Sequence, residues 1–297
     1  MEITFLGTAC MAPSKDRNHP AVFLEYKDHG ILFDCGEGTQ RQFKIANIRL
    51  TKVTKILLTH WHGDHALGIG GLLQTLGSSE YSGTLELYGP PGTKEHLYHL
   101  FKAIPFGFRV NFDVKEVQNG KVFENDDFVI DAISLEHGTI PCYAYSFREK
   151  DKRNINMERV KELRIPVGPL IGKLQGGLTV TVGENVITPD EVSTVKKGKK
   201  ISYITDTVLC TNCYSIADDS DILMCESSFT EEERDKAEEY HHLTAQQAGL
   251  IASKSGSKKL YLFHISGRHA DKTVVLDEAR TVHQDAFIAQ DFMRIKL

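Results

Sequence analysis

The stretch Thr59-His60-Trp61-His62-Gly63-Asp64-His65 constrains this chain more than any other part of it. It follows Ile56-Leu57-Leu58, an apolar run that predicts a buried strand, and its glycine marks a turn at the strand's end. Because side chains alternate along an extended backbone, His60 and His62 are expected to face one point. The aspartate and the last histidine, beyond the turn, can face a second point. Imidazoles and carboxylates suit zinc or a similar divalent ion, so the stretch predicts a site for two metals.

Composition limits the class of protein. The chain has 297 residues, with 41% hydrophobic and 25% charged, as in an ordinary globular protein of one large or two small domains. No apolar run is long enough to span a membrane, and Met1 to Leu6 indicates a first strand rather than a targeting peptide. Six cysteines in this length do not indicate a disulfide framework, and Cys210-x-x-Cys213 is the only close pair. We expect reduced thiols, a cytoplasmic location and no membrane association.

The net charge of −5 is unevenly distributed. Residues 148–200 hold twelve Lys and Arg against seven Asp and Glu, a net of +5, which leaves −10 for the rest. Such a local basic region can be an electrostatic handle for a polyanion, or equally a solvated lysine-rich loop. Its Lys, Gly and Pro content favours an extended arm over core, with one short helix near Met157 to Leu163.

Hydrophobic patterning predicts an α/β sandwich, with strands at both ends of the chain and helices between. A helix is expected from Thr39, capped by threonine or glutamate, and another from about His65 to Leu76. Thr244 is expected to cap a helix to Ser253, and Asn119-Gly120 predicts a β-hairpin. Strands are expected at residues 2–6, 21–24, 31–33, 84–88, 141–147, 201–204, 222–225 and 260–263, and a further helix at 93–103. Residues 110–135 are expected to alternate strands and turns and to end just before His137.

Three later residues, His137, Asp206 and His264, also follow predicted strands. With the first cluster they complete two ligand sets, in which Asp206 bridges both metals. The sets are His60, His62 and His137 for one ion, and Asp64, His65 and His264 for the other. A pair of metals suits hydrolysis at phosphorus, because it activates the attacking water and stabilises the developing charge.

This ligand string resembles that of the metallo-β-lactamase fold, an αββα sandwich whose members act on many substrates. Other motifs are similar to those of the short-form ribonuclease Z (tRNase Z) family, and the similarity runs from end to end. The resemblance implies a single domain over 1–297 with an inserted tRNA-binding arm at about 148–200. The motifs are the Pro-x-Lys-x-Arg-Asn loop at Pro13–Asn18, the first motif at Phe33–Gln40, the arm with Gly168-Pro169, Glu226 for the His-Glu-Ala-Thr motif, and His242-Leu243-Thr244 for the His-Ser-Thr loop. Two positions depart from the family: Cys225 replaces its usual His, and Leu243 its frequent Ser.

The resemblance implies an endoribonuclease that removes the 3′ trailer of precursor tRNA and leaves a 3′-hydroxyl on the tRNA. Asp64 would accept or orient the proton of the attacking water, and His242, oriented by Glu226, would be the general acid. It also implies two zinc ions per subunit, with manganese or iron as alternatives, and a homodimer. The expected substrate-binding residues are Lys15, Arg17, Asn18, Gly168 and Pro169. Arg17 can instead be a purely structural residue of its loop. The alternative functions are another phosphodiesterase or arylsulfatase-like hydrolase of this fold, or a non-catalytic tRNA-binding relative.

Overall fold

The computed structural model describes residues 1–103 and 109–297, which form two compact units. The larger unit comprises Met1–Glu124, Ile130–Phe147 and Lys200–Leu297. The smaller unit comprises Asn125–Val129 and Arg148–Lys199, so the segment predicted as an arm supplies most of it.

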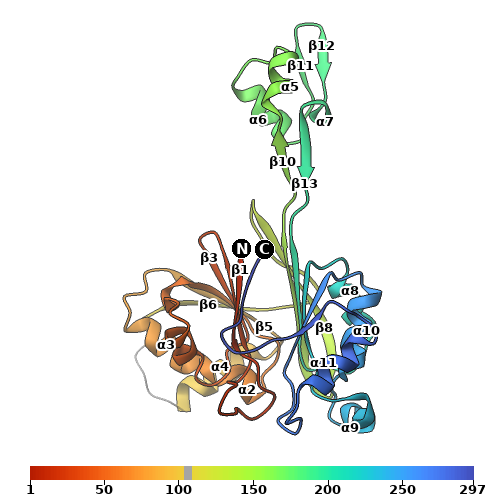
Figure 1. Cartoon of the computed structure of the whole chain (residues 1–297). Coiled ribbons are helices and arrows are strands. Elements are labelled where there is room, and N and C mark those ends of the chain that lie inside the picture. The colour runs from red at the N-terminus through yellow and green to blue at the C-terminus, as the bar shows by residue number, and fades with distance from the viewer. Residues whose placement is uncertain (104–108) are drawn as a thin grey trace. The chain divides into compact units, whose positions relative to one another are not determined.

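The larger unit is built of two seven-stranded sheets with helices on their outer faces, which confirms the predicted αββα sandwich (Figure 1). The first sheet has the order β18 (Arg294–Lys296), β1 (Glu2–Gly7), β2 (Ala21–Tyr26), β3 (His29–Phe33), β4 (Val53–Leu57), β5 (Thr84–Gly89) and β6 (Asn111–Glu116). The second has the order β17 (Ala286–Ile288), β16 (Lys259–Phe263), β15 (Ile222–Glu226), β14 (Lys200–Ile204), β9 (Ile140–Glu149), β8 (Phe128–His137) and β7 (Gly120–Glu124). Neighbouring strands from β3 to β6, and from β14 to β17, are parallel.

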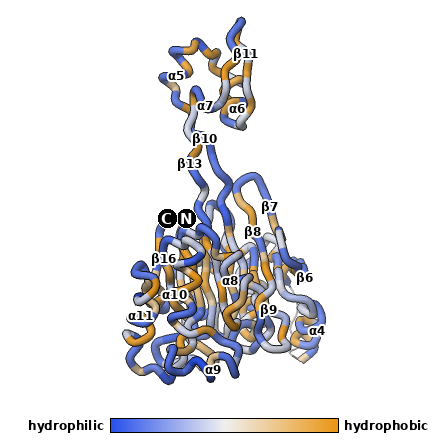
Figure 2. Tube along the Cα trace, turned by 90° about the vertical axis from the view of Figure 1, so that its right-hand side faces the viewer, coloured by the Kyte–Doolittle hydropathy of each residue, from blue (hydrophilic) through white to orange (hydrophobic). Residues whose placement is uncertain are grey.

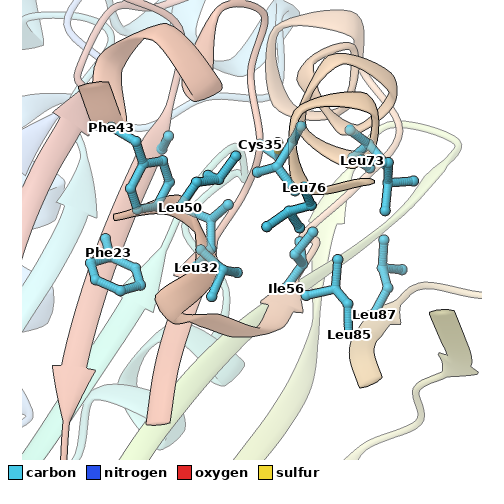
Figure 3. Packing of buried hydrophobic residues seen from close by; sticks show 14 of the residues in the cluster. Phe23, Leu32, Cys35, Phe43, Leu50, Ile56, Leu73, Leu76, Leu85 and Leu87 are labelled. Carbon is cyan, nitrogen blue, oxygen red and sulfur yellow. The ribbon is translucent and has the colours of Figure 1, made fainter. Parts of the chain in front are cut away.

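Helices α1 (Thr39–Ile45), α3 (Gly68–Gly77) and α4 (Thr93–Ala103) lie on the outer face of the first sheet (Figure 1). Beneath them, Phe23 of β2 packs edge-on against Phe43 of α1, with ring centroids 5.0 Å apart, and leucines of α3 cover Ile56 of β4 (Figure 3). Burial of each such side chain contributes about 1.5–3 kcal/mol. Helices α8 (Thr211–Ala217), α10 (Ala245–Lys254) and α11 (Thr273–Arg280) contribute buried side chains to a hydrophobic core that they share with the second sheet. Apolar segments run through the strands of both sheets (Figure 2).

The helix predicted from His65 to Leu76 is divided into α2 (Gly63–Ala66) and α3, with Leu67 between them. Gly68 explains the close packing at this break, because a Cβ atom there would lie 2.0 Å from the Gly36 carbonyl oxygen. Its N–H donates to the Cys35 carbonyl at 2.9 Å. The start of α3 is thereby fixed against the loop that follows β3, directly behind the histidine motif.

Two other local predictions are wrong and one is confirmed. Neither Thr39 nor a glutamate caps α1, because Gly38, with φ of 77°, occupies the N-cap position without a side-chain cap. Asn119-Gly120 does not form a hairpin, because β6 and β7 belong to different sheets and the chain crosses between them there. Thr244 does cap α10, through a reciprocal capping box with Gln247.

The smaller unit has a core of its own, where the sequence had indicated an extended arm. It contains the antiparallel pairs β10 (Lys152–Ile155) with β13 (Ser193–Lys196) and β11 (Val180–Val182) with β12 (Asn185–Ile187). The predicted short helix is α5 (Met157–Glu162), and α6 (Pro169–Gln175) and α7 (Pro189–Val192) accompany it. The buried side chains of this core are Val160, Ile165, Leu174, Val180, Ile187 and Val192.

Candidate active site

Strand ends of both sheets bring the predicted metal ligands together. The histidine motif follows β4, His137 ends β8, and Asp206 and His264 come directly after β14 and β16. His264 adopts a left-handed backbone conformation, with φ of 53°, which turns the chain sharply at the end of its strand. The seven predicted ligands therefore converge, although they come from four separate parts of the chain.

The seven residues form two groups that can each hold a metal ion. In the first group, His62 Nδ1 lies 3.0 Å from His60 Nε2 and 3.2 Å from His137 Nε2. In the second, His65 Nε2 lies 3.3 Å from His264 Nε2, and Asp64 Oδ2 lies 3.4 and 3.5 Å from these two nitrogens. The alternation predicted for His60 and His62 and the separate direction predicted for Asp64 and His65 are both present.

Asp206 lies between the two groups and directs one carboxylate oxygen to each. Its Oδ2 atom is 3.6 Å from His60 Nε2 and 3.9 Å from His137 Nε2. Its Oδ1 atom is 3.6 Å from His65 Nε2 and 3.4 Å from His264 Nε2. This is the arrangement that a bridging carboxylate between two cations requires.

The remaining ring nitrogens of four ligands are held by hydrogen bonds that fix the tautomer. His60 Nδ1 lies 3.0 Å from the Thr59 hydroxyl, and His65 Nδ1 lies 2.9 Å from Asp34. His137 Nδ1 is 2.9 Å from the His241 carbonyl, and His264 Nδ1 is 3.0 Å from the Ser228 hydroxyl. With a proton on each Nδ1, Nε2 is the ring nitrogen that these four histidines direct into the site, where it is placed to bind a cation. The donor set therefore fits divalent metals.

Burial and charge favour the same conclusion. Burial lowers the pKa of His60, His62 and His137, so these imidazoles remain neutral and available as ligands. Burial acts against ionisation of Asp206 too, but the neighbouring histidines His264 and His65 outweigh it and hold its pKa well below the usual range. Burial also lowers the pKa of His65 and His264, but the charge of Asp206 and the other groups around them outweigh it and raise both pKa values well above the usual range. The first group thus offers neutral nitrogen donors beside an ionised carboxylate, whereas in the second group a cation would replace the protons of the two imidazoles.

Asp34 is a functional candidate that lies in the first motif at Phe33–Gln40, where the sequence indicated no role for it. The fully buried carboxylate accepts hydrogen bonds from the Thr59 N–H at 2.8 Å, from His65 Nδ1 at 2.9 Å and from the Tyr203 hydroxyl at 3.0 Å. Because the Thr59 hydroxyl also donates to it at 2.9 Å, that hydroxyl is left to accept from His60. One carboxylate consequently orients a ligand in each group.

The predicted pairing of His242 with Glu226 is present. His242 Nδ1 lies 3.0 Å from Oε1 of the fully buried Glu226, which also accepts from the Thr207 N–H at 3.1 Å and the Ser228 hydroxyl at 2.6 Å. Burial lowers the pKa of His242, but the charges of Glu226 and Asp206 outweigh it and raise the pKa to about 9. His242 also lies in an overlapping group with Asp206 and His264 that can hold a metal, so its position admits a ligand role besides proton donation.

Of the three predicted substrate-binding residues in the loop at 13–18, one is exposed and two are anchored. Lys15 is exposed, whereas Arg17 donates to the Thr8 hydroxyl at 2.9 Å and interacts electrostatically with Asp291. Asn18 donates its backbone N–H to Asp291 at 2.8 Å and its side-chain amide to the Glu37 carbonyl at 2.8 Å.

Gly168 and Pro169 lie in the smaller unit, where both are exposed. Gly168 has φ of 147° and Pro169 opens α6, a first-turn position that suits proline.

The two departures from the family motifs are packed in the core. Cys225 and Leu243 are both fully buried in the hydrophobic cluster beneath α8 and α10. Their replacement of histidine and serine leaves Glu226 and His242 in contact, so an apolar environment there is compatible with the pair.

Comparison with known proteins identifies the class that fold and site define, the metallo-beta-lactamase superfamily, whose pattern matches residues 15–153. The chain is 39% identical to the ribonuclease Z of Methanothermobacter thermautotrophicus over 298 residues, covering 100% of this chain and 97% of that protein. It is 40% identical to the ribonuclease Z of Archaeoglobus fulgidus over 303 residues, again covering 100% and 97%. The crystal structure of the short form of human tRNase Z superposes with a TM-score of 0.73 at 27% identity, covering 100% of this chain and 99% of that one. The chain belongs to the ribonuclease Z family.

Within the described residues, no helix is long and apolar enough to cross a membrane.

Proposed function

We propose that the protein is an endoribonuclease that removes the 3′ trailer of precursor tRNA and leaves a 3′-hydroxyl on the tRNA. The observation that carries this proposal is its end-to-end relationship to ribonucleases Z, which includes the smaller unit as well as the metal ligands. The complete ligand set argues against the alternative of a non-catalytic tRNA-binding protein.

The proposed metal content is two zinc ions per subunit, with manganese or iron as alternatives for this donor set. One ion would be held by His60, His62 and His137, the other by Asp64, His65 and His264, with Asp206 between them. When bound, such ions activate water and neutralise charge at the scissile phosphate.

In the proposed reaction Asp64 accepts or orients the proton of the attacking water. Its carboxylate accepts from the Met11 N–H at 3.1 Å and contacts His65 and His264. Burial disfavours its charge, but the attraction of His65 and hydrogen bonding by His264 hold its pKa far below the usual range. An ionised carboxylate at this position can orient the water while remaining a metal ligand.

His242 delivers a proton to the leaving 3′ oxygen of the tRNA. Because its Nδ1–H is engaged with Glu226, Nε2 is the nitrogen that can transfer a proton. Glu226 stabilises the charged imidazolium before transfer and keeps the ring orientation afterwards.

The smaller unit binds the body of the tRNA through phosphates. Four exposed cations in it, Lys161, Arg164, Lys173 and Lys196, have no acidic partner in the described part of the chain. Lysine and arginine contacts to phosphate position a nucleic acid without reading its sequence. Among the predicted substrate-binding residues, Gly168 and Pro169 belong to this unit.

Of the predicted substrate-binding residues in the 13–18 loop, Lys15 is the one best suited to hold the acceptor end, because it is exposed. Arg17 and Asn18 shape the loop that carries it. On the resemblance to short-form ribonucleases Z, we also propose that the protein is a homodimer and that it works in the cytoplasm. Light scattering of the purified protein tests the oligomeric state.

A cleavage assay on a 3′-extended tRNA tests the function. We expect one cut after the discriminator nucleotide, a 3′-hydroxyl on the tRNA, and loss of cleavage on chelation. Hydrolysis of small phosphate or sulfate esters without cleavage of precursor tRNA would favour another hydrolase of this fold. Tight binding without cleavage, with metals present, would favour a binding protein.

A further inference from the structure

The thiols of Cys210 and Cys213 lie outside the metal site and have no part in the proposed reaction. Their sulfur atoms are 3.6 Å apart, and the Cys213 N–H donates to the Cys210 carbonyl at 3.1 Å. Cys210 is the residue before α8 and is partly exposed, whereas Cys213, in the first turn of that helix, is fully buried. An accessible thiol is thus in direct contact with a protected one.

The surroundings do not provide a metal site for this pair. Among the described residues, the groups of His, Cys, Asp and Glu that can hold an ion do not include either cysteine. Two sulfur donors without further ligands fall short of the four that structural zinc requires. The contact therefore points to chemistry between the two sulfurs.

We propose that Cys210 and Cys213 form a reversible disulfide in exchange with a small disulfide oxidant such as oxidised glutathione, and that its formation slows the enzyme. The Cys210 thiolate attacks the oxidant, gives a mixed disulfide and releases one small thiol. The Cys213 sulfur then attacks the Cys210 sulfur and releases the second. The protein loses two electrons and two protons, and the oxidant becomes two thiols.

The ionisation of Cys210 is consistent with its role as the attacking group. The hydrogen bond from Cys213 is the main influence on this thiol and lowers its pKa to about 6, against the opposing effect of burial. A partly exposed thiol with this property reacts before a buried one.

The disulfide would act on the metal site through the loop between β14 and α8. Bond formation brings the sulfurs to about 2.05 Å, and the core around Cys213 directs the movement to Cys210. The same loop contains Asp206, Thr207 and Val208. The Thr207 N–H donates to Glu226 at 3.1 Å, and the Val208 N–H donates to the Glu136 carbonyl at 2.9 Å. A displacement of Cys210 therefore strains the segment that positions the bridging carboxylate and the partner of His242.

The test uses the metal-loaded full-length protein in glutathione buffers of graded redox potential. Free thiols are alkylated, and the peptide that contains both cysteines is analysed by mass spectrometry. We expect this peptide to lose two hydrogen atoms, to regain them with dithiothreitol, and to form no internal disulfide in Cys210→Ser. Cys213→Ser should instead retain a mixed disulfide on Cys210, which keeps the test informative if one variant folds poorly. Failure of the internal disulfide to form, or oxidation confined to Cys10, the other partly exposed cysteine, would overturn the proposal.

The consequence is measured separately. Single-turnover cleavage of 3′-extended tRNA should slow about 10-fold on oxidation and recover on reduction, because misplacement of catalytic groups by about 1 Å is costly. Cys210→Ser should show no oxidant-dependent change. Metal release to a chelator provides a second readout that does not depend on the substrate, so the inference and the proposed function can fail independently. A disulfide that forms without altering cleavage or metal release would refute the coupling.

Discussion

Nδ1 of His242 lies 3.0 Å from Oε1 of Glu226, a carboxylate with no exposure to solvent. The second oxygen of Glu226 accepts from the Ser228 hydroxyl, which in turn lies 3.0 Å from Nδ1 of His264. The proposed proton donor and a proposed metal ligand are therefore oriented by one buried charge. Glu226 therefore has two contacts of consequence, one to His242 directly and one to His264 through Ser228.

Replacement of His242 by alanine tests the proposed general acid. We expect single-turnover cleavage of precursor tRNA to fall by about 10²–10⁴-fold, the usual contribution of a positioned acid or base. Metal content should stay the same, because the two principal ligand groups do not include His242. His99→Ala, at an exposed histidine of α4, is the matched control. Full activity in His242→Ala contradicts the acid role, and loss of a metal ion would indicate that His242 is a ligand instead.

Replacement of Glu226 by glutamine keeps the shape of the side chain and removes its charge. We expect a smaller loss of cleavage than in His242→Ala, because the imidazole remains but is neither charged nor oriented as before. The charge of Glu226 is one of the two main influences that raise the pKa of His242, so that pKa should fall. Nuclear magnetic resonance titration of the His242 ring in metal-loaded protein measures this shift. An unchanged His242 pKa would show that Glu226 does not control its ionisation.

Asp34→Asn tests the carboxylate that supports both ligand groups. The change removes the charged acceptor of His65 and disturbs the Thr59 hydroxyl that orients His60. Removal of such a supporting group typically weakens metal affinity by about 10–100-fold. Competition with a chromogenic chelator measures the affinity, and Asp235→Asn, at an exposed aspartate of α9 (Arg234–Glu239), is the control. Wild-type affinity in Asp34→Asn would mean that the ligands are held by their backbone positions alone.

The four unpaired cations of the smaller unit predict a specific loss of tRNA binding. Replacing Lys161, Arg164, Lys173 and Lys196 together by alanine should raise KM for precursor tRNA and reduce its salt dependence. For every phosphate that is no longer neutralised, the slope of log affinity against log salt falls by about 0.7–0.9. Hydrolysis of a small phosphodiester should be nearly unchanged. The matched control replaces three lysines and one arginine of the larger unit, Lys44, Arg49, Lys254 and Lys259, all of them exposed.

Equal loss on the tRNA and on the small phosphodiester would contradict a binding role for these cations. Deletion of residues 150–175 is a coarser form of the same test. It removes β10 and thereby exposes the pairing edge of β13, so the substitutions are the cleaner experiment.

Local sequence signals were sufficient to place the predicted ligands at strand ends and insufficient for the residues that contact them. The histidine motif, His137, Asp206 and His264 all follow apolar strands, so the sequence could place each at a strand end, where polar ligands can gather. The strand ends belong to two different sheets, and their meeting is a property of the whole fold. Asp34, Ser228 and Tyr203 could not be given roles, because their contacts join residues far apart in the chain.

The core of the smaller unit was missed for a related reason. Its apolar residues are spread over short elements among Lys, Gly and Pro, so no single stretch has the periodicity of a buried helix or strand.

Lys15 and Arg17 are close together in one motif, but their replacement is expected to affect different properties, substrate binding for Lys15 and stability for Arg17. Arg17→Ala removes a contact to Thr8 and leaves Asp291 without its cationic neighbour, so we expect a loss of about 1–3 kcal/mol in stability. Lys15→Ala removes an exposed side chain and should leave Tm unchanged while it raises KM for precursor tRNA. Thermal unfolding of the metal-loaded variants, together with cleavage kinetics on both tRNA and a small phosphodiester, separates the two effects. An unchanged KM in Lys15→Ala would remove Lys15 from the proposed substrate contacts, and a stable Arg17→Ala variant with raised KM would return Arg17 to them.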